Sequence, residues 1–228
     1  MTKNFKVRLS VSLLLLAIAA VCLFTFDSIP FKIFFGAFAS VAIIELLSFY
    51  RRLGTPKPYH ILLTLAEIFL LAAATIFVAK LDVIQIILLI FGVCGYDVFA
   101  YLFGGWLGGS IFGAHRPFPH ISKNKTWEGT IMGLISSFVL SGIIMLITSN
   151  TDYLLLLCGP LALIGDLFES FLKRRFNVKD SNEIVIKNPL FAKLELLVGG
   201  SEGHGGYLDR IDSLAFTATA ILLLLTIL

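Results

Sequence analysis

The stretch VIQIILLIFGVCGYDVFAYLF, residues 83–103, decides the class of fold. It carries one charged side chain, Asp97, in an apolar run of the length that crosses a hydrocarbon core of roughly 30 Å as an α-helix. Similar runs recur through the 228 residues, of which 57% are hydrophobic and 14% charged, against about 25% charged in a soluble domain. Because the runs are continuous rather than alternating, they predict helices and not a β-barrel.

The sequence therefore predicts an all-α, polytopic transmembrane helix bundle that forms a single integral membrane domain over residues 1–228. Seven spans are expected, at about 9–26, 29–49, 60–80, 83–103, 129–149, 152–172 and 209–228. We expect the first span to be an anchor rather than a signal peptide, because its apolar run is too long for a typical signal sequence.

The basic residues predict the orientation of these spans. Sixteen of the 18 lysines and arginines lie in segments 1–8, 51–57, 104–128 and 173–210, on one side of the predicted bundle. Only Lys32 and Lys80 lie on the other side. Since cytoplasmic loops are enriched in lysine and arginine, the N-terminus and the two long loops are expected in the cytoplasm. The net charge of +3 is thus a topology signal, and it gives no reason to expect a nucleic-acid partner.

Acidic residues within the predicted spans gather toward their cytoplasmic ends. They are Glu45, Glu67, Asp97, Asp166, Glu169, Asp209 and Asp212. Intramembrane carboxylates are costly and usually functional. Their one-sided placement predicts a polar cavity open to the cytoplasm, and favours an enzyme over a transporter. For Glu45 and Glu67 the alternative is simple pairing with the basic residues of 51–57.

One loop carries groups that suit phosphate. In HISKNKTWEGT, residues 120–130, hydroxyl and ammonium groups come directly before a predicted helix; they belong to Ser122, Lys123, Lys125 and Thr126. Lysine binds phosphate as a point charge, and the positive end of a helix also favours an anion. Glu128 is expected to cap this helix. The alternative is a basic loop that contacts lipid headgroups.

A glycine-rich loop precedes the last span. In GGSEGHGGYLDRIDS, residues 199–213, the glycines let the backbone approach a ligand and expose N–H groups to phosphate oxygens. Asp209 and Asp212 are i, i+3 neighbours, and such oxygen ligands suit Mg²⁺ when substrate phosphates complete its shell. His204 is left open between a base, a phosphate contact and a structural role.

The segment GDLFESFLKRR, residues 165–175, repeats this spacing. Asp166 and Glu169 share one helix face, and Lys173 lies near the same stripe two turns on. Carboxylates that hold a metal, with lysines that neutralise a triphosphate, are typical of phosphoryl or nucleotidyl transfer.

The same residues fall into ordered motifs that resemble those of the phosphatidate cytidylyltransferases (CDP-diacylglycerol synthases). The resemblance covers roughly residues 92–228. The matching residues are Asp97, Ala100, Tyr101 and Gly104; Ser122 and Lys125 to Gly129; Gly165 to Ser170; Lys173 and Arg174; Lys179 and Asp180; His204 to Gly206; and Asp209, Arg210 and Asp212. The sequence departs from the family pattern at residues 182–201, an insert expected to form a short helix at the cytoplasmic interface.

The resemblance implies that a cytidylyl group passes from CTP to phosphatidate, giving CDP-diacylglycerol and pyrophosphate. It implies Mg²⁺, with a second cation as an option, bound by Asp166, Asp209, Asp212 and Asp97. The implied catalytic residues are Asp166, Asp209, Lys173 and Lys125, and the implied substrate-binding residues are Ser122, Thr126, Lys179, His204, Gly205, Gly206 and Arg210. It implies an integral protein of a bacterial inner membrane, in contact with membrane lipids and with its site facing the cytoplasm. A homodimer is one alternative for its assembly.

Two other classes stay open at this point. A related polyprenol or phytol kinase would transfer the γ-phosphoryl group of a nucleotide to a lipid alcohol. A transporter or a non-catalytic lipid-binding membrane protein would transfer no group at all.

Overall fold

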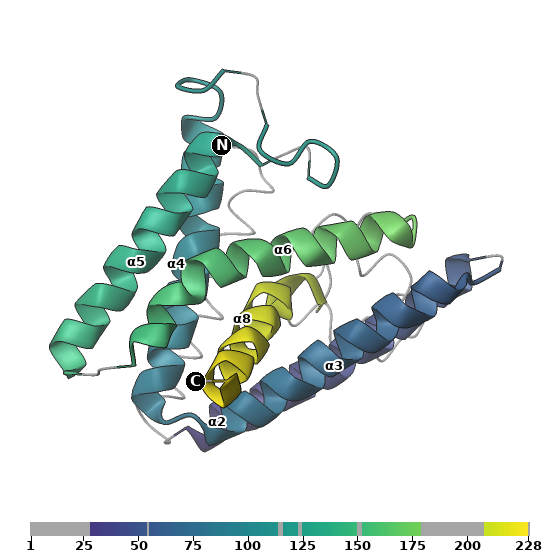
Figure 1. The fold of residues 1–228 in the computed structure, drawn as a ribbon, viewed down its shortest axis with the longest axis horizontal. Helices are drawn as coiled ribbons and strands as arrows, with labels where there is room; N and C mark the ends of the chain where they lie inside the picture. The colour runs from purple at the N-terminus through teal and green to yellow at the C-terminus, as the bar shows by residue number, and fades with distance from the viewer. Residues whose placement is uncertain are drawn as a thin grey trace. The chain divides into compact units, whose positions relative to one another are not determined.

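The computed structural model describes residues 28–53, 55–113, 116–122, 125–149, 152–178 and 208–227. Within these ranges the chain is helical and has no strand (Figure 1). The elements are α2 (Ile29–Ser48), η1 (Phe49–Arg52), α3 (Pro58–Lys80), α4 (Val83–Trp106), α5 (Trp127–Thr148), η2 (Tyr153–Leu157), α6 (Cys158–Arg175) and α8 (Leu208–Ile227). The all-α prediction is confirmed.

Several of the predicted spans appear as apolar helices. Among the described residues, the segments long and apolar enough to cross a membrane are Phe31–Ser48, Pro58–Lys80, Val83–Trp106, Trp127–Thr148 and Tyr153–Arg175. α8 has a shorter apolar stretch, Ile211–Ile227. The expected span 9–26 and the insert 182–201 lie outside the described residues. The chain is an integral membrane protein, and its seven spans and their orientation stay predictions.

The described residues divide between two compact units. The first unit lies within Met1–Phe69 and Lys173–Ile211, and the second within Leu70–Leu172 and Asp212–Leu228. The prediction of one membrane domain stays a prediction.

In the second unit, a capping box starts α4. Asp82 Oδ1 accepts from the backbone N–H of Gln85 at 2.7 Å, and Gln85 Oε1 accepts from the N–H of Asp82 at 3.1 Å. These bonds satisfy donors that a helix start leaves open. The side-chain amide of Gln85 also donates to Asp152 Oδ2 at 2.7 Å. The start of α4 is therefore tied to the start of η2, and Asp97 follows about four turns along the helix.

Small residues let α4 and α5 lie side by side (Figure 1). A Cβ on Gly129 would lie 2.5 Å from the backbone oxygen of Ala100, so only glycine fits there. Further along, the hydroxyl of Ser137 donates to the backbone oxygen of Gly92 at 2.7 Å. In lipid, where apolar surfaces gain little by leaving the solvent, such close packing and hydrogen bonding hold helices together. The contact holds the end of α4 beside the start of α5.

α8 packs on α6 in the same way within the second unit. A Cβ on Gly165 would lie 3.0 Å from Cα of Ser213 and 2.8 Å from Cβ of Phe216. Gly165 directly precedes Asp166, so the close contact with α8 is made one residue from a predicted metal ligand.

In the first unit, an aromatic cluster joins the start of α3 to the end of α6. The ring of Phe176 lies 4.9 Å from that of His60 and 5.6 Å from that of Phe49, centroid to centroid. His60 Nδ1 accepts from the N–H of Lys57 at 2.9 Å, so Nε2 carries the proton and donates to the backbone oxygen of Arg175 at 3.1 Å. The ring thus satisfies one backbone group just before α3 and one at the end of α6 while it stays buried.

Candidate active site

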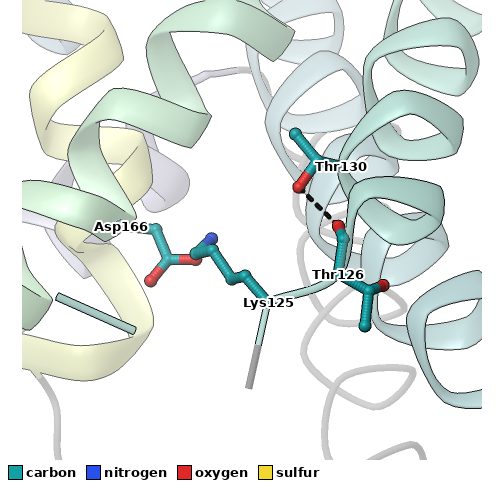
Figure 2. Close-up of polar contacts among 4 residues, drawn as sticks. All are labelled: Lys125, Thr126, Thr130 and Asp166. Carbon is teal, nitrogen blue, oxygen red and sulfur yellow. Dashed lines mark hydrogen bonds and ion pairs between the residues drawn. The ribbon is translucent and has the colours of Figure 1, made fainter. Parts of the chain in front are cut away.

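Two predicted catalytic groups of the second unit meet in the structure. Nζ of Lys125, just before α5, forms an ion pair with Oδ2 of Asp166 on α6. Figure 2 shows the two side chains pointing toward each other. The lysine side chain is 15% exposed and the aspartate side chain 34%. The pair is therefore shielded enough to interact strongly, yet it remains within reach of a soluble ligand.

Asp97 belongs to the same cluster. Its carboxylate interacts electrostatically with the carboxylate of Asp166 and with the ammonium of Lys125. Two carboxylates and one ammonium carry a net charge of −1 when all are ionised. Such a cluster attracts a divalent cation through its acids and a phosphate through its lysine.

The start of α5 is built by Thr126. Its side-chain oxygen accepts from the N–H of Gly129 at 3.1 Å, which makes it the N-cap of the helix. The hydroxyl of Thr130 donates to the backbone oxygen of Thr126 at 2.9 Å, the dashed contact in Figure 2. The Thr126 oxygen accepts a hydrogen bond as the cap, and its O–H group can still donate one to the substrate. The predicted contact with substrate is therefore compatible with capping, and it stays a prediction.

Glu128 lies in the first turn of α5, where its carboxylate accepts from its own backbone N–H, and it also binds a neighbouring turn. Its Oε1 accepts from the backbone N–H groups of Gly109, Ile111 and Phe112, each at 3.0 Å. Gly109 has a φ of 85°, a backbone conformation that favours glycine. One carboxylate oxygen therefore holds the turn that follows α4 against the first turn of α5. A sequence pattern gives no sign of this, because the three donors are backbone groups.

In the first unit, a second aspartate–lysine pair forms. Nζ of Lys173 on α6 lies 2.9 Å from Oδ1 of Asp209 on α8, and both side chains are 14% exposed. Glu45 on α2 accepts from the backbone N–H of Leu208 at 2.9 Å through Oε2. A carboxylate at a helix N-terminus stabilises that end. Glu45, for which the sequence left open a functional role and pairing with basic residues, thus secures the turn that carries Asp209.

The remaining predicted residues are placed as follows. Ser122 lies in a turn closed by its N–H and the backbone oxygen of Phe118 at 2.9 Å. The backbone oxygen of Asp212 would lie 3.3 Å from a Cβ on Gly165. The backbone of α8 at Asp212 is therefore packed against α6. Lys179, His204, Gly205, Gly206 and the side chain of Arg210 lie outside the described residues.

The donor set that could hold a metal is small. Across the described part of the chain, no three His, Cys, Asp or Glu side chains meet as a metal-binding group. Asp97 and Asp166 remain as a pair. Mg²⁺ is usually bound by one or two carboxylates together with substrate phosphates and water, so this pair fits that mode of binding. The larger set that includes Asp209 and Asp212 stays a prediction.

The fold and this cluster define an integral membrane protein in which two aspartates and a lysine lie together within one unit. Residues 59–186 match the cytidylyltransferase family, and the chain belongs to that family. It is 30% identical over 213 residues to the phosphatidate cytidylyltransferase of Rickettsia prowazekii, covering 88% of this chain and 85% of that protein. The protein of the same name in Rickettsia typhi is 29% identical over 215 residues, with the same shares. The one in Haemophilus influenzae is 36% identical over 121 residues, covering 49% of this chain and 36% of that protein.

Proposed function

We propose that this chain transfers the cytidylyl group of CTP to phosphatidate. An oxygen of the lipid phosphate forms a bond to the α-phosphorus of CTP, and the bond from that phosphorus to the β-phosphate oxygen breaks. The products are CDP-diacylglycerol and pyrophosphate. The observation that carries the proposal is the Lys125–Asp166 pair with Asp97 beside it, in a chain of the cytidylyltransferase family.

In the cluster, the acidic residues would bind the metal and the lysine would bind phosphate. Asp97 and Asp166 would hold Mg²⁺, which supplies charge neutralisation for the triphosphate and the leaving pyrophosphate when it is bound. Lys125 neutralises Asp166 while the site is empty and exchanges that carboxylate for a phosphate when the nucleotide arrives. No side chain has to act as a nucleophile, because the lipid phosphate is one already. Catalysis then rests on orientation and on fixed charges that face the reacting phosphates.

The family resemblance supports the other proposed residues. Asp209 and Asp212 are proposed as further metal ligands, and Lys173, with the hydroxyls of Ser122 and Thr126, as further phosphate ligands. The substrate contacts of Lys179, His204, Gly205, Gly206 and Arg210 rest on the family resemblance. We also propose that the site faces the cytoplasm from a bacterial inner membrane and that a second cation and a homodimer complete the enzyme.

The reaction is tested with the purified protein, Mg²⁺, labelled CTP and a panel of lipids. Phosphatidate is expected to yield labelled CDP-diacylglycerol together with pyrophosphate. A lipid alcohol that yields a phosphorylated lipid and a nucleoside diphosphate would instead identify a kinase. Lipid flux across vesicles in the absence of nucleotide would instead identify a transporter.

The role of the cluster is tested with Asp166→Asn. The amide keeps the shape of the side chain but loses the charge that binds a cation and pairs with Lys125. Turnover is expected to fall by at least about 100-fold, the usual scale for loss of a charge-stabilising group, while the protein still inserts into membranes. Asp152→Asn is the matched control, because that carboxylate lies at η2 and accepts from Gln85. Near-normal rates for Asp166→Asn would remove the cluster from the mechanism.

A further inference from the structure

Tyr96 lies at the cluster but has no part in the motifs. It directly precedes Asp97 on α4, and it is only 1% exposed. Its ring packs against α5, since a Cβ on Gly133 would lie 2.9 Å from Cδ2 of Tyr96. The ring is therefore fixed by two helices, and its hydroxyl cannot swing out to solvent.

The hydroxyl of Tyr96 is an unsatisfied polar group. It is buried, and within the described residues it finds no hydrogen-bond partner. A buried hydroxyl without a partner destabilises the folded protein, because it gives up its hydrogen bonds to water. Phenylalanine would fill the same space against Gly133 without that cost, so packing does not account for the oxygen.

The charges around Tyr96 indicate what the hydroxyl can bind. Nζ of Lys125 lies 5.7 Å from the centroid of the tyrosine ring. The hydroxyl also interacts electrostatically with the carboxylates of Asp166 and Asp97. A phosphate oxygen can bridge two donors of this kind with hydrogen bonds of about 2.8 Å each. A tyrosine hydroxyl is neutral at physiological pH, so it adds a donor to this cluster without adding charge.

We propose that Tyr96 is a substrate-binding residue whose hydroxyl donates a hydrogen bond to a phosphate oxygen of the substrate that Lys125 holds. This inference rests on the proposed function and adds a residue to its site. The phosphate belongs either to the nucleotide or to the lipid, and the two sources are separated by experiment. The ring, held between α4 and α5, orients the donor before the substrate arrives, which lowers the entropic cost of binding.

The test is Tyr96→Phe in the full-length protein. Three quantities are measured: the thermal midpoint in detergent, the equilibrium binding of labelled CTP with Mg²⁺ alone, and the KM for phosphatidate at saturating CTP. We expect the thermal midpoint to stay equal or rise, because the variant removes an unsatisfied oxygen. We expect one of the two substrates to bind about tenfold more weakly, which corresponds to about 1.4 kcal/mol. Weaker CTP binding assigns the contact to the nucleotide, and a raised KM for phosphatidate with unchanged CTP binding assigns it to the lipid.

Ser141→Ala is the matched control. Ser141 on α5 also has a buried hydroxyl that finds no partner among the described residues, and it lies about 22 Å along α5 from Thr126. Its removal is expected to leave the binding of both substrates unchanged.

The outcomes separate this inference from the proposed function. If wild-type protein, CTP and phosphatidate release no pyrophosphate, the proposed function fails. If wild type is active and Tyr96→Phe binds both substrates as wild type does, only the role of Tyr96 is wrong. A lower thermal midpoint with unchanged binding would show that the hydroxyl is structural, and it would likewise overturn the inference.

Discussion

Replacing Gly129 by alanine tests whether the close contact of α4 and α5 sets up the site. The new Cβ would lie 2.5 Å from the backbone oxygen of Ala100, 2.9 Å from Cα of Gly104 and 3.1 Å from its nitrogen. These are backbone atoms, so no side-chain rotation relieves the clash. Ordinary contact begins at 3.4 Å, so the two helices must separate by about 0.9 Å at this point. Overpacking on this scale costs about 1–3 kcal/mol.

The separation also reaches the proposed site residues. Lys125 and Thr126 lie directly before α5 and move with its first turn, whereas Asp97 lies on α4. A misplacement of about 1 Å can cost about 100-fold in rate. We therefore expect kcat/KM of Gly129→Ala to fall by about 10- to 100-fold, together with a lower thermal midpoint. The assays are pyrophosphate release with CTP and phosphatidate, and thermal unfolding in detergent.

Gly142→Ala is the control on the same helix. A Cβ on Gly142 would meet nothing within 4 Å, and alanine favours a helix over glycine by about 1 kcal/mol. This variant should keep full activity and equal or higher stability. If Gly129→Ala matched wild type in both rate and thermal midpoint, the close helix contact would have no role in positioning the site.

Two carboxylates that hold backbone groups give further predictions. Glu128→Gln keeps an acceptor but loses its charge, and charge-assisted hydrogen bonds are about twice as strong as neutral ones. The amides of Gly109, Ile111 and Phe112 should therefore exchange with deuterium faster than in wild type. Unchanged exchange would mean that Glu128 does not hold this turn. Glu45→Ala leaves the N–H of Leu208 without its carboxylate, at a cost of about 1–3 kcal/mol, so the thermal midpoint should drop by several degrees. If Glu45→Ala were as stable as wild type, the cap on α8 would contribute nothing.

The helices were predictable where the sequence has a continuous apolar run with a clear start. α3 and α4 begin within two residues of their expected spans; Pro58 is the first residue of α3 and Asp82 caps α4. α4 ends at Trp106 and not, as was expected, at residue 103, because Gly104 and Gly105 continue the helix and do not terminate it. The 3₁₀ turn η2 before α6 was not expected, since hydropathy does not distinguish 3₁₀ from α geometry.

The site was predictable in its residue types but not in its pairings. The acids and lysines stood out because charges are costly in a membrane. That Lys125 meets Asp166, 41 residues further along the chain, depends on how α5 and α6 pack. The contact of Glu45 with Leu208 and that of Glu128 with the turn after α4 were missed, because both bind backbone N–H groups, which every residue but proline has. Tyr96 was missed because an aromatic residue in an apolar run reads as packing; only the missing partner of its hydroxyl distinguishes it.

The Lys125–Asp166 pair also bears on how the protein is made in the cell. A newly synthesised helix leaves the translocation machinery for lipid, where a lone charge raises the free energy of insertion, by about 2.5–3.5 kcal/mol at the helix centre. Asp166 lies within the apolar segment Tyr153–Arg175. The positive charge that neutralises it belongs to Lys125, which is translated earlier. The segment that contains α6 thus inserts into lipid more readily once α5 is in place. Biogenesis of this protein would therefore favour a fixed order of helix assembly.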